Sequence, residues 1–129
     1  MVTNAKELDT ASMSKAGLQV FFNISRKWGL SIEHEKALLG NPTENEFAVW
    51  KENPTDITLD KVTLERISHL MSIYHNLRTL LPDDNAANTW VKRANNAPLF
   101  NGDTALNYML KGGVLGLQKV HQYLDGEST

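Results

Sequence analysis

Residues 58–81, TLDKVTLERISHLMSIYHNLRTLL, carry the strongest periodic pattern in the chain. Large apolar side chains recur there at spacings of three and four residues, which places them on one face of a helix. These side chains are Leu64, Ile67, Leu70, Met71, Tyr74, Leu77, Leu80 and Leu81. Pro82 then ends the pattern. A helix of about 24 residues is about 36 Å long, so we expect it to span the domain and to join its two halves.

Three shorter helices are predicted before this long one. Residues 17–28 repeat large apolar groups with helical spacing, and a short helix follows over 31–39. A third helix is predicted over 43–53, because Thr43 and Glu46 have the spacing of a capping box. The order helix, turn, helix, turn, helix is that of a helix-turn-helix unit, with the third helix in the recognition position.

The segment after Pro82 also reads as helical. Asp83 and Asp84 suit the start of a helix whose buried edge is Trp90-Val91. The stretch NNAPLFNG, residues 95–102, predicts a loop with a tight turn, and short helices are expected over 105–111 and 114–125. No segment alternates as a strand does, so the predicted fold is all-α.

Three glycines mark the boundary between the last two helices. Gly112 is predicted to end the first helix in the left-handed conformation, and Gly113 would let the second helix begin at once. Gly116 lies inside the second helix, where glycine costs about 1 kcal/mol relative to alanine. We therefore expect another group to come very close to Gly116, either from the same chain or from a partner.

Composition restricts the classes of function. The chain has 129 residues, 41% of them hydrophobic, which fits one compact domain or two small helical ones sharing a core. It contains no cysteine, so disulfides and cysteine zinc sites are excluded. There is no apolar run of membrane length and no apolar signal-peptide core, so the cytoplasm is the expected compartment. The net charge is −2 and neither half is basic, which argues against binding nucleic acid mainly through phosphate contacts.

These patterns predict a division of the chain. Residues 1–15 are interpreted as a mobile tail, 16–62 as a helix-turn-helix-like domain and 63–129 as a second helical domain, with the long helix 58–81 shared. The aromatic residues of the first half suffice for a small core, although some of them could form a homodimer face, as could the long helix through Tyr74 or Leu77. The candidate DNA contacts are Arg26, Lys27, Lys36, Thr43, Asn45 and Lys51.

The stretch 90–125, WVKRANNAPLFNGDTALNYMLKGGVLGLQKVHQYLD, resembles the C-terminal toxin-binding domain of the Xre/MbcA/ParS antitoxins. The resemblance includes a helix that starts with Trp, a loop similar to N-x-x-L-F/L-G-G, a helix that ends in Gly-Gly and a last helix with V-x-x-Y-L. The upstream residues resemble the helix-turn-helix half of the same family. The matching positions are Trp90, Asn95, Leu99, Phe100, Gly102, Ala105, Leu106, Met109, Leu110, Gly112, Gly113, Val120, Tyr123 and Leu124.

The resemblance implies a type II antitoxin that neutralises a toxin acting on NAD, most often a RES-domain toxin, by covering its cofactor cleft. Operator binding and a toxin–antitoxin hetero-oligomer are also implied. The candidate toxin-binding residues are Lys111, Gly112, Gly113, Gly116, Gln118, Lys119, His121, Gln122 and Tyr123. The sequence departs from the family at Asn101, which replaces a glycine, and at the recognition helix. There Glu44 and Glu46 would repel phosphates.

Two alternatives compete with an antitoxin. A stand-alone helix-turn-helix repressor is favoured by the helix order and the basic residues named above. An enzyme is disfavoured, because His69 and His75 are six residues apart and fall on different helix faces, so they do not form an i, i+4 metal pair. Glu33 and Glu35 are interpreted as solvated or capping groups. We therefore predict no catalytic residue, no metal site and no cofactor.

Overall fold

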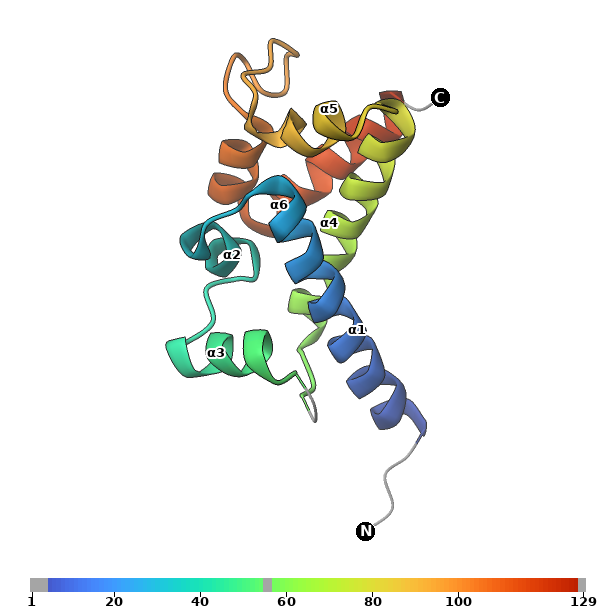
Figure 1. The fold of residues 1–129 in the computed structure, drawn as a ribbon, viewed down its shortest axis with the longest axis vertical. Helices are drawn as coiled ribbons and strands as arrows, with labels where there is room; N and C mark the ends of the chain where they lie inside the picture. Colours follow the sequence, from blue (N-terminus) through green and yellow to red (C-terminus); the bar gives the residue numbers. More distant parts are fainter. Residues whose placement is uncertain (1–4, 55–56, 128–129) are drawn as a thin grey trace.

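The computed structural model describes residues 5–54 and 57–127, with side chains described from residue 10 onward. The chain is all-α in these ranges, and its only strand-like feature there is an isolated antiparallel bridge between Ala94 and Thr104. Figure 1 shows the order of the helices, from α1 at the N-terminus to α6 at the C-terminus. They are α1 (Ala5–Trp28), α2 (Ile32–Leu38), α3 (Glu44–Glu52), α4 (Lys61–Leu80), α5 (Asp84–Thr89), the 3-10 turn η1 (Trp90–Lys92) and α6 (Ala105–Glu127).

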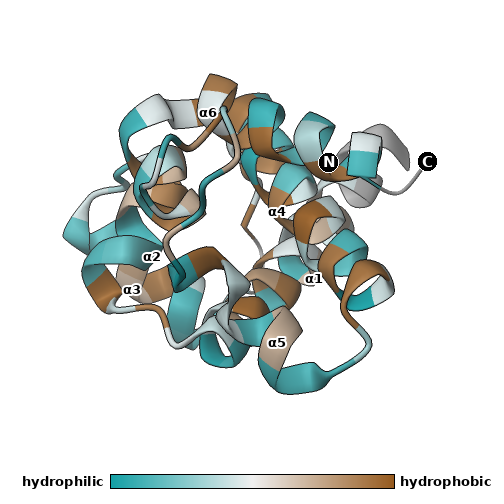
Figure 2. Ribbon diagram, turned by 90° about the horizontal axis from the view of Figure 1, so that it is seen from above, coloured by the Kyte–Doolittle hydropathy of each residue, from teal (hydrophilic) through white to brown (hydrophobic). Residues whose placement is uncertain are grey.

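The long helix α4 is the centre of the fold, as its periodicity predicts. It lies between α1 and α6 and packs on both (Figure 2). Its buried side chains include Ile67, Leu70, Ile73 and Leu77. Apolar residues from both halves of the chain form one continuous core around it. α4 starts at Lys61, three residues later than expected, because the carboxylate of Asp60 accepts a hydrogen bond from the backbone N–H of Thr63 and caps the helix.

The first helix is longer than its sequence pattern indicates. α1 begins at Ala5, so residues 5–15, which the sequence pattern assigns to a tail, are part of a helix in the structure, and residues 1–4 lie outside the described part. Ser14 is fully buried and explains the extension. Its hydroxyl donates to the carbonyl of Thr10 at 2.8 Å and accepts from the N–H of Leu59 at 2.9 Å, which fixes α1 to the segment before α4.

The structure also shows which of the large apolar residues are buried in the chain's own core. Phe21, Phe22, Trp28 and Phe47 are buried in the chain's own core, as is Leu77, so none of these five is available for a homodimer face. Met71, by contrast, belongs to the apolar face predicted for α4 but is 41% exposed. None of the helices within the described ranges combines the length and the hydrophobicity that a membrane crossing requires.

Candidate functional site

The two halves of α6 meet at a sharp break at Gly113. Its backbone has φ 61° and ψ −150°, a conformation outside the helix region that is open almost only to glycine. The sequence placed the left-handed residue at Gly112, one position too early; Gly112 keeps a negative φ and has open space around it. The break turns the second half of α6 back toward the first.

Gly116 lies where these two halves touch. A Cβ atom built on Gly116 would lie 3.2 Å from the carbonyl oxygen of Tyr108 and 3.7 Å from the Cα of Met109. Both atoms belong to the backbone of the first half of the same helix. The close approach predicted for Gly116 therefore comes from the chain itself, and Gly116 is buried rather than offered to a partner.

Several exposed residues of α6 lie close together on its solvent-facing surface. Of the predicted toxin-binding residues, Lys111, Gly112, Gln118, Lys119 and Gln122 are exposed. The structure adds Leu115, which is 55% exposed and lies three, four and seven positions before the last three of these residues. We call Leu115, Gln118, Lys119 and Gln122 the α6 stripe. It combines one exposed apolar side chain, at its N-terminal end, with three polar ones.

Sequence reasoning missed Leu115, although a signal was present. Leu117, Val120 and Leu124 define the buried face of this helix. At about 100° per residue, Leu115 lies about 140° from Val120, on the far side of the helix. An apolar residue at that angle is out of register with the core, and a helical projection would have identified it.

Two predicted binding residues instead point into the fold. His121 is half-buried, and its Nδ1 lies 2.9 Å from the Nδ1 of His69 on α4. Tyr123 packs against Trp90, with ring centroids 6.5 Å apart, and against Phe100 at 5.4 Å. Burial raises the pKa of the Tyr123 hydroxyl. The structure therefore separates His121 and Tyr123 from the exposed stripe.

The loop before α6 holds the helix in place through one aromatic side chain. Phe100 is buried and makes edge contacts with Trp90, Tyr108 and Tyr123 at centroid distances between 5.4 and 5.8 Å. The turn that presents it depends on Asn101, whose φ is 50°. Asn101, at the position where the resemblance leads one to expect a glycine, adopts a positive φ, which asparagine tolerates.

Asp103 fastens the start of α6. Its Oδ1 accepts hydrogen bonds from the side-chain amide of Asn107 and the backbone N–H of Thr104, and these bonds hold the pKa of Asp103 below its ordinary value. The other oxygen lies 3.6 Å from the Nζ of Lys111. Lys111 is still largely exposed, so this distant ion pair leaves it accessible to a partner.

In the first half of the chain, α2 and α3 both begin at a capping residue, and the capping box predicted for Thr43 and Glu46 is confirmed. Ser31 caps α2, and Thr43 caps α3 in a capping box with Glu46. The Thr43 hydroxyl accepts from the N–H of Glu46 at 3.1 Å, while the Glu46 carboxylate accepts from the N–H of Thr43 at 2.9 Å. The side chain of Thr43 is therefore used within the helix.

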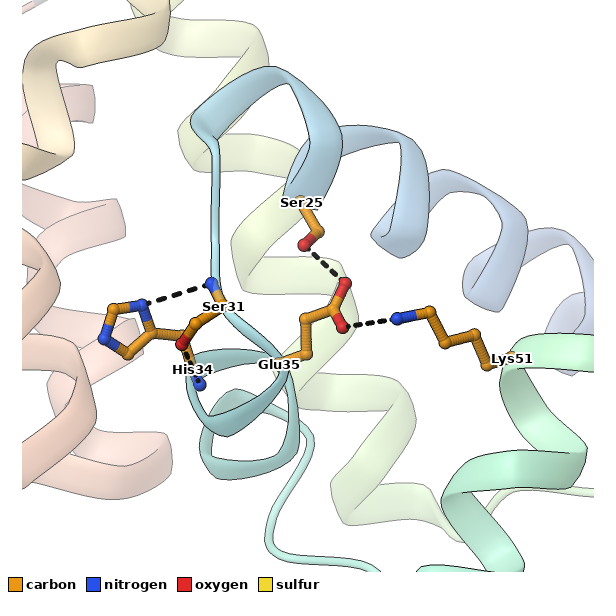
Figure 3. Close-up of polar contacts among 5 residues, drawn as sticks. All are labelled: Ser25, Ser31, His34, Glu35 and Lys51. Atoms are coloured by element: carbon orange, nitrogen blue, oxygen red, sulfur yellow. Dashed lines mark hydrogen bonds and ion pairs between the residues drawn. The ribbon is translucent and has the colours of Figure 1, made fainter.

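The buried carboxylate of Glu35 links three helices (Figure 3). It accepts a hydrogen bond from Ser25 of α1 at 2.5 Å and pairs with Lys51 of α3 at 3.0 Å. The interpretation of Glu35 as a solvated or capping group is wrong, because it is a buried polar group with partners on both neighbouring helices. Lys51 is consequently committed to this contact.

The remaining candidate DNA contacts are partly neutralised. Lys36 forms an ion pair with Glu44 at 2.6 Å, and the hydrogen bond that its ammonium donates to this carboxylate raises the pKa of Lys36. Arg26 donates to the side chain of Asn23, while Lys27 and Asn45 are exposed. Two of the four basic residues proposed for DNA contact thus already face a carboxylate.

Within residues 5–54 and 57–127, no cluster of three or more His, Cys, Asp or Glu side chains could hold a metal ion. The α6 stripe follows the break at Gly113, and α6 shares no extensive contact with α3.

Comparison with known proteins assigns the C-terminal part of the fold. Residues 76–127 match the family model described as the antitoxin Xre/MbcA/ParS C-terminal toxin-binding domain, a segment that runs from the end of α4 through α6. The chain is also 38% identical over 112 residues to uncharacterized protein y4oB of Sinorhizobium fredii, and the alignment covers 87% of this chain and 84% of that protein. No solved structure matches significantly.

Proposed function

Because residues 76–127 match the toxin-binding domain of the Xre/MbcA/ParS antitoxins, we propose that the chain is an antitoxin, and that it neutralises a cognate toxin by covering the toxin's active-site cleft. The toxin we propose is a RES-domain enzyme that degrades NAD, and the complex forms in the cytoplasm. The family match over 76–127 carries this proposal. The antitoxin itself performs no chemistry in this role; it acts as a binding protein.

The α6 stripe is the surface we propose for toxin contact. Protein interfaces depend on a few apolar anchors surrounded by polar residues that exclude water. Leu115 has the character of such an anchor, while Gln118, Lys119 and Gln122 supply donors and one positive charge around it. Lys111 and Gly112 extend the same surface across the break in α6. A glutamine or lysine from this surface would occupy space otherwise filled by nicotinamide or phosphate.

Co-expression tests the proposal directly. The open reading frame next to this gene is expressed alone and together with the antitoxin, and growth, cellular NAD and co-purification are measured. We expect the reading frame alone to stop growth and deplete NAD, and the pair to restore both and purify as one complex. If neither is restored and the two proteins do not co-purify, the proposed function is wrong.

Replacing Leu115 with glutamate is expected to weaken toxin binding about tenfold or more. The substitution removes an exposed apolar anchor and places a charge that the closed interface must desolvate. Folding should be little affected, because Leu115 makes limited contact with the core. Isothermal titration of the toxin with wild-type and L115E antitoxin measures the change in Kd.

The matched control is Val62→Glu. Val62 is 52% exposed at the first turn of α4, outside the toxin-binding segment, and a carboxylate there is favourable for the helix. We expect V62E to bind the toxin as wild type does. Equal loss of affinity in the two variants would count against a specific anchor, and no loss in L115E would exclude the α6 stripe.

A second candidate function is operator binding, supported by the order of α1, α2 and α3 and by the exposed Asn45 on α3. Homodimers, which we also propose, would place two such units on one operator. The ion pairs at Lys36 and Lys51 oppose it, since phosphates would have to compete with Glu44 and Glu35. Light scattering gives the oligomeric state.

If the chain binds its own promoter, Glu44→Gln should increase affinity about two- to fivefold at low salt, because it removes a repelling charge and releases Lys36 toward phosphate. Fluorescence anisotropy with promoter DNA measures this, and Glu52→Gln at the other end of α3 is the control. Absence of binding by the wild type, both variants and the toxin complex would exclude the repressor function.

A further inference from the structure

Four side chains, His69, His121, Asp125 and Asn76, form a series of polar contacts between α4 and α6. The Nδ1 atoms of His69 and His121 lie 2.9 Å apart. The Nε2 of His121 lies 3.3 Å from one carboxylate oxygen of Asp125, and the other oxygen accepts a 2.8 Å hydrogen bond from the amide of Asn76. These contacts therefore run from α4 to α6 and back to α4. They join the two helices that share the largest contact in the fold.

The contact between the two imidazoles limits how many protons they can hold. A 2.9 Å separation of two Nδ1 atoms requires one of them to carry a hydrogen and the other to accept it. The carboxylate of Asp125 favours a hydrogen on the Nε2 of His121. Neutral His69 can then donate to neutral His121, or accept from protonated His121. When both rings are protonated, each Nδ1 carries a hydrogen and the bond cannot exist.

Few titratable or charged groups lie near the imidazoles of His69 and His121 in the described part of the chain. On α4, Glu65 lies one turn before His69 and favours its protonation, while His75 lies beside His121 in the same cleft. On α6, Asp125 is the charge in contact with the pair. Burial first, and then the proximity of His121, lower the pKa of His69. These influences agree with the geometry, which admits one proton more easily than two.

We propose that the His69–His121 pair is an acid-sensitive contact, in which a second proton breaks the hydrogen bond and loosens the packing of α6 against α4. The cleft beside it, about 390 Å³ in volume and lined by Ser72, His75 and Asn76, admits water to the separated rings. The α6 stripe belongs to the same helix. Resting on the proposed function, the consequence is weaker toxin binding in mild acid.

The sign of the effect on stability follows from linkage. The folded His69 has a lower pKa than its ordinary value of 6.5, so the unfolded chain binds more protons below that pH. Stability is therefore fully present above about pH 6.5 and is lost as pH falls toward the folded pKa. Asp60 and Asp103 have lowered pKa values, so these two carboxyl groups titrate in stronger acid than His69.

The test is urea unfolding of the isolated antitoxin between about pH 7.5 and about pH 5. In the wild type we expect the folding equilibrium constant to fall on acidification, by at most about tenfold per pH unit for one linked proton. In His69→Gln the loss should be clearly smaller, because a neutral amide can still donate to His121 and does not titrate. His75→Gln, in the same cleft but outside the pair, should follow the wild type.

Proton NMR of the imidazole rings supplies a second measurement that does not depend on global unfolding. We expect acidification to change the ring signals of His69 and His121 together, and to move backbone signals of α4 and α6 with them. Parallel unfolding profiles for wild type and H69Q, or two independent titrations without backbone changes, would overturn the proposal. Neither measurement uses the toxin. The acid-sensitive contact can therefore be disproved while toxin neutralisation stands, and toxin neutralisation can be disproved while the acid-sensitive contact stands.

Discussion

Replacing Gly116 with valine is expected to lower the free energy of unfolding by about 3 kcal/mol, the upper range for overpacking a tight contact. The new Cβ would lie 3.2 Å from the carbonyl oxygen of Tyr108, and both neighbouring atoms belong to the helix backbone. A flexible side chain could rotate away, but a helix backbone cannot. The two halves of α6 would have to separate, which moves the α6 stripe relative to the rest of the domain.

The neighbouring glycines provide the comparison for this prediction. Gly113→Ala should cost about 1–3 kcal/mol, because alanine is strained at φ 61° and ψ −150°. Gly112→Ala should be neutral or slightly stabilising, since it has open space and a negative φ. Urea unfolding followed by circular dichroism gives all three values. If G116V were as stable as G112A, the close approach between the two halves would be disproved.

The glycines at the break in α6 also show what the sequence can and cannot predict. A Gly-Gly pair between two apolar helical patterns predicts a break, and the break is present. Which glycine takes the positive φ depends on how the second half packs on the first. That packing involves Tyr108 and Met109 against Gly116 and is not encoded in local spacing. The fold class, the element order and the caps at Thr43 and Asp83 were predictable for the opposite reason, because they depend on near neighbours.

The parts of the fold that were missed depend on contacts distant in sequence. The first turns of α1 carry few large apolar residues, and Ser14 holds them through Leu59, 45 positions away. The Glu35–Lys51 pair and the His69–His121 pair likewise join separate helices. The sequence identifies each of these residues as polar, but only the packing of the helices shows which polar residues are in contact. Two basic residues predicted to contact DNA consequently lie beside carboxylates instead.

Phe100→Ala is expected to reduce the free energy of unfolding by about 4 kcal/mol, within the range for removing a fully buried phenylalanine. Phe100 is buried and touches the rings of Trp90, Tyr108 and Tyr123. These three rings come from η1 and from both halves of α6. Alanine would leave a cavity at the point where the loop, η1 and α6 meet, so the α6 stripe should lose its fixed position as well.

Two smaller changes separate the loss of the ring from the loss of volume. Phe100→Leu keeps much of the apolar volume and should cost about half as much, because it loses the edge contacts while leaving a smaller cavity. Tyr123→Phe keeps both neighbouring rings and should change stability by less than about 1 kcal/mol. Thermal and urea unfolding rank the three variants. A cost below about 1 kcal/mol for F100A would mean that this aromatic cluster does not hold α6, and that the exposed stripe is positioned by its packing on α4 alone.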